Sequence, residues 1–166
     1  MREQLPKPTG PISRQEMAGL TGLSLNDRKV RSLADLRFCT SLEILSLEAT
    51  PVSDLSPLAS LRTLETLSIN RTPTEDLTPL RSLRDLRQLF VGKTEVTDIS
   101  PLTALTFLRY LSLAYSPVAD TEPLLTLCTH GGLKNGELLL GGLPLTWEAR
   151  CVHVPLIAAL GVRGGS

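Results

Sequence analysis

Leucines recur along this chain at a constant spacing. Six of them stand 22 residues apart without a gap, namely Leu23, Leu45, Leu67, Leu89, Leu111 and Leu133. Around them recurs one frame, L-x-x-L-x-L-x-x-T-P-V-x-D-L-S-P-L-x-x-L, which is most complete between residues 42 and 127. In each copy two apolar residues flank a variable one, and this alternation predicts a short strand with one buried face. The period predicts a solenoid in which each repeat adds one strand to a parallel sheet.

The second half of each frame predicts the segment that returns the chain to the next strand. Prolines such as Pro51 and Pro73 end strand pairing, because proline offers no N–H group. An aspartate follows in each repeat, at Asp54, Asp76, Asp98 and Asp120. We expect these carboxylates to accept backbone N–H bonds. We expect Ser56, Thr78 and Ser100 to cap short 3-10 or α segments that form the convex side, opposite the concave sheet.

Both ends of the chain depart from the frame. Ser13 and Glu16 have the spacing of a capping box, so residues 1–19 are expected to form a tail and a capping helix. Residues 20–145 carry the repeats, and Cys39 occupies a position that is leucine in later copies. Leu138 follows Leu111 by 27 residues, which predicts a five-residue insertion near 128–136 and removes Leu133 from the strand.

Residues 146–166 are expected to close the array. A helix is predicted from Thr146 to about Leu160, with Pro155 as a kink or break. Three of its side chains are expected to face the core, namely Trp147, Val152 and Leu156. The glycine-containing segment 161–166 is expected to be a flexible tail.

The repeats resemble the 22-residue leucine-rich repeats of the phosphatase-1-regulator and bacterial internalin kind. The position that is usually Asn in such repeats is here a hydroxyl residue, at Thr50, Thr72, Thr94 and Ser116. A hydroxyl can make a smaller version of the bonds that the Asn side chain makes to the backbone. The resemblance implies an α/β leucine-rich repeat solenoid with helical caps that acts as a protein-binding scaffold without catalysis.

Composition narrows the function further. The formal charge is zero, from 17 basic and 17 acidic residues, so no global field favours nucleic acid or anionic lipid. The sequence contains no apolar run long enough for a membrane-spanning helix and no secretory signal at its start. Three unpatterned cysteines favour a reducing compartment, and we expect a cytoplasmic protein. No catalytic motif, metal-ligand spacing or cofactor fingerprint is present.

The candidate site lies on strand positions that point away from the leucine core. Serine is the usual residue between the two strand leucines, and Phe90 replaces it in one repeat. Tyr110 and Tyr115 follow in the next repeat, in a chain that holds only three Phe and two Tyr. Gly92 and Ala114 would form a shallow floor beside them. Polar residues complete the predicted partner-binding set, namely Arg71, Lys93, Arg87, Gln88 and Arg109.

Aromatic side chains with arginine at their rim are typical of protein-binding hot spots. The main hypothesis is a non-enzymatic interaction scaffold that binds a protein through its concave face, as a monomer or as a subunit of a hetero-complex. One alternative is that Phe90 and Tyr110 only cover the sheet or contact the terminal helix. Two other functions stay open: a ribonucleoprotein component that contacts RNA through the basic-aromatic patch, and an internalin-like surface adhesin.

Overall fold

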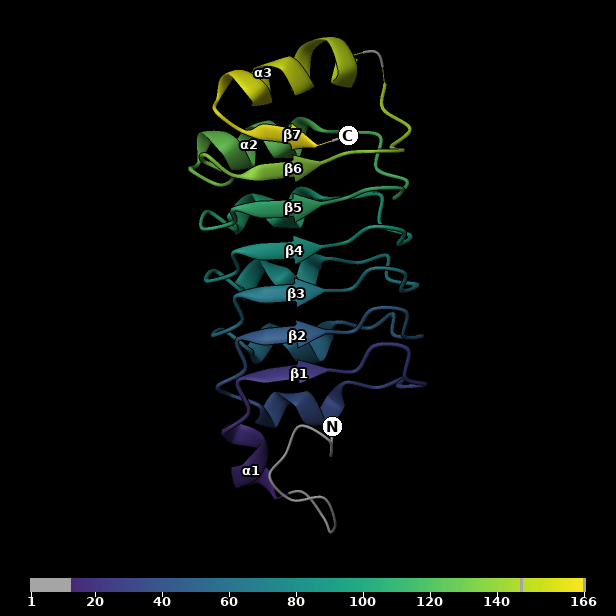
Figure 1. The fold of residues 1–166 in the computed structure, drawn as a ribbon, viewed down its shortest axis with the longest axis vertical. Helices are drawn as coiled ribbons and strands as arrows, with labels where there is room; N and C mark the ends of the chain where they lie inside the picture. Colours follow the sequence, from purple (N-terminus) through teal and green to yellow (C-terminus); the bar gives the residue numbers. More distant parts are fainter. Residues whose placement is uncertain (1–12, 147, 166) are drawn as a thin grey trace.

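The computed structural model describes residues 13–146 and 148–165, and these residues build one elongated stack of repeats (Figure 1). The seven-stranded sheet is parallel, and its strands lie in chain order. The strands are β1 (Gly22–Ser24), β2 (Ile44–Ser46), β3 (Thr66–Ser68), β4 (Gln88–Phe90), β5 (Tyr110–Ser112), β6 (Glu137–Leu139) and β7 (Arg163–Gly165).

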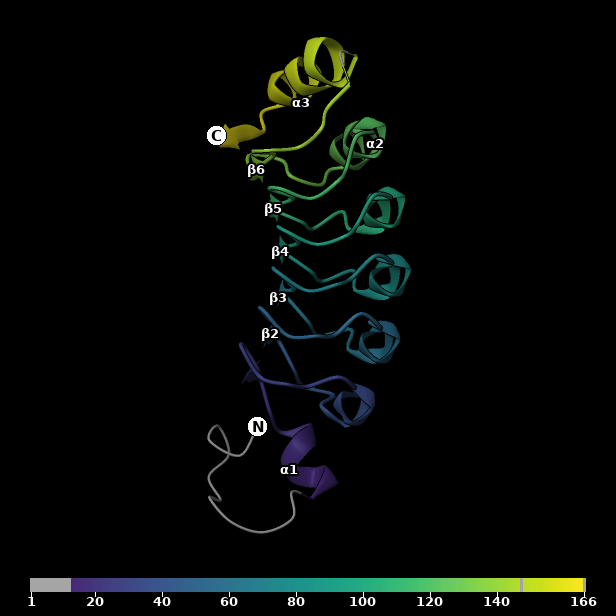
Figure 2. The ribbon, with the colours of Figure 1, turned by 90° about the vertical axis from the view of Figure 1, so that its right-hand side faces the viewer.

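Short helical segments return the chain from one strand to the next. Four are five-residue 3-10 helices, namely η2 (Ala34–Phe38), η3 (Ser56–Ser60), η4 (Thr78–Ser82) and η5 (Ser100–Ala104). They are followed by the α-helix α2 (Glu122–Thr129). Figure 2 shows the strands on the concave side and the helices on the convex side. The stack curves because strands pack about 4.8 Å apart, whereas packed helices need about 8–10 Å.

The strand leucines hold the repeats in one register. Leu23 is paired with Leu45, and the pairing continues through Leu67, Leu89 and Leu111. Each of these side chains points into the core and is at most 2% exposed. Cys39 is completely buried at its leucine position, as the sequence predicts. The core is therefore continuous along the stack, and each repeat buries its apolar face against its neighbours.

The aspartates make the predicted turn bonds, but the hydroxyl residues after them are not helix caps. Asp54 accepts a hydrogen bond from the backbone N–H of Ser56 at 2.8 Å, and the three later aspartates do the same two residues ahead. Ser56 is itself the first residue of η3, and the preceding cap position is Leu55, which makes no side-chain bond. The predicted capping by Ser56, Thr78 and Ser100 is wrong, because each is the first residue of its helix and its own backbone N–H is bonded to the aspartate two residues earlier.

The first helix agrees with its sequence signal. In α1 (Arg14–Ala18), the Glu16 carboxylate accepts a bond from the backbone N–H of Ser13 at 2.8 Å, and the Ser13 hydroxyl accepts one from the N–H of Glu16. The helix ends at Gly19. The predicted tail before residue 13 lies outside the described residues.

The insertion in the sixth repeat is confirmed. Leu138, not Leu133, pairs with Leu111, so the strand spacing widens here from 22 to 27 residues. The longer helix α2 and the turn after it take up the additional residues. Leu133 is buried, but it lies in this turn at φ 57° and donates its N–H to the Leu108 carbonyl.

The C-terminal segment differs from its prediction in two ways. A π-helical turn (Ala149–His153) leads into α3 (Val154–Ala159), and Pro155 lies in the first turn of α3. Val152 and Leu156 are 40% and 49% exposed, so their predicted core contact is wrong. The wider π turn rotates the helix face, and Ala149 and Ile157 are buried instead. Trp147 lies outside the described residues.

The predicted flexible tail is also wrong, because it contains a strand. Residues Arg163–Gly165 form β7, which pairs in parallel with β6. The Arg163 N–H donates to the Gly136 carbonyl at 2.9 Å, and Val162 is 5% exposed.

Candidate functional site

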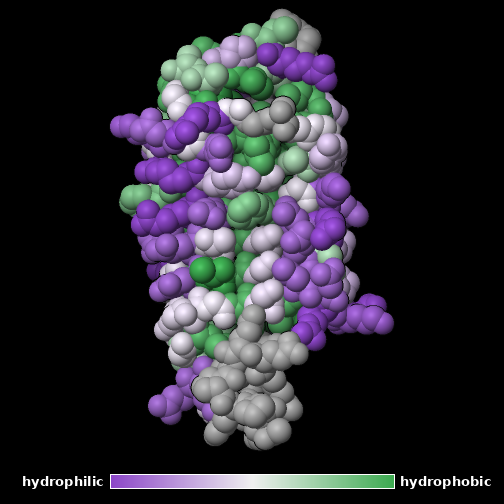
Figure 3. All heavy atoms as spheres, viewed as in Figure 1, coloured by the Kyte–Doolittle hydropathy of each residue, from purple (hydrophilic) through white to green (hydrophobic). Residues whose placement is uncertain are grey.

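Two columns of side chains cover the concave sheet, because strand residues alternate between the two faces. The first residues of the strands form one column, namely Gly22, Ile44, Thr66, Gln88, Tyr110, Glu137 and Arg163. The third residues form the other, which reads Ser24, Ser46, Ser68, Phe90, Ser112 and Leu139. Figure 3 shows apolar and pale residues along the middle of this face, with hydrophilic residues on both sides.

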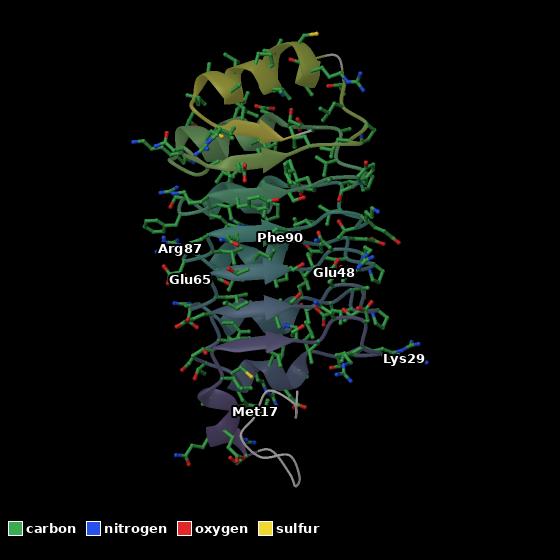
Figure 4. All side chains as sticks on the ribbon, in the orientation of Figure 1. Met17, Lys29, Glu48, Glu65, Arg87 and Phe90 are labelled. Atoms are coloured by element: carbon green, nitrogen blue, oxygen red, sulfur yellow. The ribbon has the colours of Figure 1, made fainter. Side chains whose placement is uncertain are left out.

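Phe90 and Tyr110 meet at the centre of the sheet. Their ring centroids lie 4.8 Å apart with an interplanar angle of 37°, and both residues are partly exposed. Phe90 rises from the middle of the sheet in Figure 4. Burial and the nearby Glu137 carboxylate raise the pKa of the Tyr110 hydroxyl, which stays protonated and able to donate a hydrogen bond. The terminal helix does not cover this pair: α3 lies beyond β7 and packs against α2 (Figures 1 and 2).

Two of the predicted arginines lie beside the strand starts. Arg87 and Glu65 lie together at this edge of the sheet (Figure 4), with Arg87 Nε 3.5 Å from a Glu65 carboxylate oxygen. Arg109 donates to the carbonyls of Leu108 and Gly131, so it contacts the inserted turn. Gln88 is exposed on β4, between Thr66 and Tyr110 in the first-residue column.

The other predicted cations lie beyond the strand ends. Arg71 forms a 2.9 Å ion pair with Glu48, and Lys93 Nζ lies 5.4 Å from the centroid of the Tyr115 ring. Together they border an open hollow of about 280 Å³, called here the Tyr115 hollow, lined by Glu48, Asn70, Arg71, Gly92, Lys93, Ser112, Ala114 and Tyr115. The eight predicted residues thus form a central aromatic pair and two flanking groups. In a parallel sheet all strands start at one edge and end at the other, so residues before the strands and residues after the strands lie at opposite edges.

Several residues of this face were not in the predicted partner-binding set. Glu48, Asn70 and Ser112 line the Tyr115 hollow, and their 22-residue spacing from recognised positions was the available signal. Glu137 and Arg163 lie with Tyr110 around a second hollow of about 220 Å³. Glu137 could have been found from the shifted spacing, because it directly precedes Leu138, whereas Arg163 could not, because it belongs to the unexpected strand β7.

Solved structures similar to this one are repeat solenoids. Internalin C2 of Listeria monocytogenes is 28% identical with a TM-score of 0.72, covering 85% of this chain and 70% of the internalin. Internalin F of the same organism is 23% identical with a TM-score of 0.68, covering 96% and 51%. A leucine-rich repeat protein of Leptospira interrogans is 17% identical with a TM-score of 0.79, covering 95% and 40%.

This chain has the leucine-rich repeat fold. Its seven parallel strands and short 3-10 turns have the architecture of these neighbours, which confirms the resemblance read from the sequence. This chain spans about half of the length of internalin F and 40% of the length of the Leptospira protein. Its sequence matches no protein-family model and no curated protein.

The described residues of this leucine-rich repeat protein gather no metal-binding cluster of His, Cys, Asp or Glu. Burial raises the pKa of the Cys39 thiol, helped by the Asp35 charge, and burial also raises that of Cys128. Both cysteines are therefore held as neutral thiols, which are poor nucleophiles. Over the same residues, no helix has the length and apolar character needed to cross a membrane.

Proposed function

We propose that this leucine-rich repeat protein is a non-enzymatic scaffold that binds a protein partner through the concave face of its central repeats. One observation carries the proposal: Phe90 and Tyr110 pack against each other, and Phe90 replaces the serine that the neighbouring repeats present. Similarity to internalins and to another leucine-rich repeat protein supports an interaction role for the class.

The aromatic pair is not needed to cover the sheet. Ser68 and Ser112 flank Phe90 in its column, and both of their strands pair normally. Thr66 occupies the position equivalent to Tyr110 two strands away. Because the fold accepts a serine or a threonine at these positions, the partly exposed rings are best explained by contact with another molecule.

The surroundings of the pair resemble the centre and rim of a protein interface. Apolar rings occupy the middle, and charged residues such as Arg87, Glu65, Lys93 and Glu48 occupy the two sides. A desolvated aromatic centre inside a polar rim is the arrangement that concentrates binding energy in protein complexes. Whether the protein works as a monomer or within a hetero-complex, and whether it is cytoplasmic, remain predictions.

RNA binding is less well supported. Two arginines of the predicted basic patch, Arg71 and Arg87, already lie beside glutamates, and the formal charge of the chain is zero. Phosphate contacts would have to compete with these carboxylates. The adhesin alternative rests on the likeness to internalin C2, and a protein partner at the same concave face is compatible with it.

The test compares binding by the wild type with binding by two variants. Partners are captured under crosslinking from an extract of the source organism and identified by mass spectrometry, and the purified partner is then titrated by calorimetry. The double variant Phe90→Ser, Tyr110→Thr inserts the residues of neighbouring repeats, so folding is retained. We expect its dissociation constant to rise at least about 100-fold.

The matched control is Phe107→Thr. Phe107 is 51% exposed but lies between η5 and β5, outside the two concave columns, and the equivalent residue of an earlier repeat is Thr63. The affinity of the Phe107→Thr variant for the purified partner should stay within about twofold of the wild type. Retained affinity in the double variant, with thermal unfolding unchanged, would overturn the proposal; equal loss in the control would do the same.

A further inference from the structure

The turns that follow three strands border the Tyr115 hollow. Arg71, Lys93 and Tyr115 occupy the same turn position in three successive repeats, and all three have left-handed backbone conformations, with φ of 58°, 57° and 61°. Glycine and asparagine adopt this conformation at less cost than other residues. In the next repeat the position is Gly142, at φ 72°. The same position is Asp27 and Ala49 in the two earlier repeats, at φ 56° in both, so the conformation is common to the repeats and the hollow differs by its long side chains.

Gly142 leaves the space that the Tyr115 ring occupies. A Cβ added at Gly142 would overlap the Tyr115 ring, so the ring packs directly over the glycine backbone. Tyr115 is still 65% exposed, and its ring forms one wall of the hollow. The floor is made in part by Gly92, where an added Cβ would lie 3.0 Å from the Ala114 carbonyl oxygen.

The Tyr115 hollow presents more hydrogen-bond donors than hydrogen-bond acceptors. Lys93 lies over the Tyr115 ring, and among the described residues no carboxylate pairs with it. Arg71 gives one terminal nitrogen to Glu48, which leaves the other N–H groups of its guanidinium. Asn70 accepts the Gly92 N–H at 2.7 Å through its amide oxygen, so its NH₂ group remains as a donor. The Ser112 hydroxyl lines the same space.

We propose that the Tyr115 hollow binds a single carboxylate of the partner, from an Asp or Glu side chain that reaches past the Phe90–Tyr110 pair. This inference rests on the proposed function and specifies the partner as an acidic and apolar segment. Lys93 supplies the unpaired charge, and Arg71 bridges between Glu48 and the incoming group. A phosphate dianion fits less well, because the Glu48 carboxylate lines the hollow and repels a second negative charge.

The experiment uses blocked tetraglutamate as the probe and blocked tetraglutamine as its neutral match. Each is titrated into the ¹⁵N-labelled full chain at low ionic strength, with inorganic phosphate as a third titrant. Tetraglutamate alone should shift the amide signals of Gly92, Lys93, Ala114 and Tyr115. Shifts at the exposed Arg62, Arg81 and Arg84 instead, or tighter binding of phosphate at the hollow, would overturn the proposal.

Three variants connect binding to the charges of the hollow. Lys93→Met keeps the length of the side chain and should weaken tetraglutamate binding about fivefold. Glu48→Gln removes the competing carboxylate and should tighten it about two- to fivefold. Lys29→Met removes the same charge from an exposed site that projects away from the hollow (Figure 4) and should leave binding unchanged. Equal effects of Lys29→Met and Lys93→Met would show a general charge effect and contradict the inference.

Failure of this inference can be distinguished from failure of the proposed function. The Phe90→Ser, Tyr110→Thr variant should lose the protein partner but bind tetraglutamate like the wild type. Lys93→Met should weaken binding of both the protein partner and tetraglutamate. If Lys93→Met leaves the captured partner and the probe unaffected while the aromatic variant loses the partner, the carboxylate site is wrong and the concave scaffold stands.

Discussion

Each central repeat buries one hydroxyl side chain at the turn after its strand. The hydroxyls of Thr50, Thr72 and Thr94 donate to the carbonyl three residues earlier, at 2.7 to 2.8 Å. Ser116 instead reaches back to the Val91 carbonyl of the preceding repeat. These short side chains donate to buried carbonyls of the turns, and the Val91 carbonyl accepts from both Thr94 and Ser116.

Thr72→Val tests this role at constant size. Thr72 is 3% exposed, and its hydroxyl also shares a 2.9 Å bond with Thr74. We expect the free energy of unfolding to fall by about 1–2 kcal/mol, because a buried carbonyl loses its donor. Urea denaturation monitored by circular dichroism measures the change. The exposed Thr97→Val should stay within about 0.5 kcal/mol of the wild type, and an equal loss there would contradict the interpretation.

The turn aspartates predict a pH dependence. A bond from the Ser56 hydroxyl, and then one from the Ser56 backbone N–H, lower the pKa of the Asp54 carboxyl from its ordinary value of 3.8. The hydroxyl and backbone N–H of Thr78 lower the pKa of Asp76 in the same way. Because the folded pKa lies below the unfolded one, this stabilisation is complete above the ordinary value and is lost as the pH falls through the folded value.

Asp54→Asn with Asp76→Asn should therefore flatten the acid limb of the stability curve. Asparagine keeps an oxygen that can accept the turn N–H but does not titrate. Between about pH 5 and about pH 2.5, the free energy of unfolding should fall less in the variant than in the wild type. Urea unfolding at a series of pH values tests this. Parallel curves for the two proteins would mean that these carboxylates do not contribute to acid unfolding.

At the scale of elements, the C-terminal end combines a π turn, a short α-helix and a strand. The π turn Ala149–His153 rotates the helix that follows, so that Ile157 faces the core and is 3% exposed. The chain then turns at Gly161, with φ 86°, and enters β7. The helix and the strand together cover the last repeat, whose apolar residues would otherwise face water.

Two neighbouring alanine substitutions test which helix face is buried. Ile157→Ala should lower the free energy of unfolding by about 2–4 kcal/mol, because it leaves a cavity. Leu156→Ala should change it by less than about 0.5 kcal/mol, because Leu156 is 49% exposed. Chemical denaturation of both variants gives the comparison. The opposite order would support the face predicted from the sequence.

At the scale of the molecule, the protein is a one-dimensional array. Each strand pairs only with the strands before and after it, and the 3-10 segments pack in the same order. Stability in such arrays comes from the contacts between neighbours, so damage to a central repeat breaks two contacts at once. The concave face depends on this continuity, because Phe90 and Tyr110 come from different repeats.

Leu67→Ala tests whether the array unfolds as one unit. Leu67 is fully buried on β3, and its truncation should cost about 3–5 kcal/mol. Hydrogen exchange should show an equal loss of protection for Leu45 on the neighbouring strand β2 and for Leu138 on the distant strand β6. Loss confined to β3 and its neighbours, with β6 unaffected, would show instead that the repeats unfold separately.

The sequence by itself determined the repeat, the direction of the strands and the register of the sheet. These follow from local periodicity, because the partner of each repeat is the next copy of the same frame: Leu45 meets Leu67 for the same reason that Leu67 meets Leu89. The aspartate turns and the buried position of Cys39 were predictable on the same basis. The location of the aromatic residues on the concave face also follows from the alternation of strand residues.

Only the tertiary structure decided which of these residues lie together. Phe90 stacks on Tyr110 while Tyr115 lies beside Lys93 beyond the strand ends, because Tyr110 is the first residue of β5 whereas Tyr115 lies in the turn after that strand. The face of the last helix and the strand β7 also escaped prediction. Residues there have no later repeat to pack against, so the π turn and the docking of Val162 set their position, and periodicity does not encode either one.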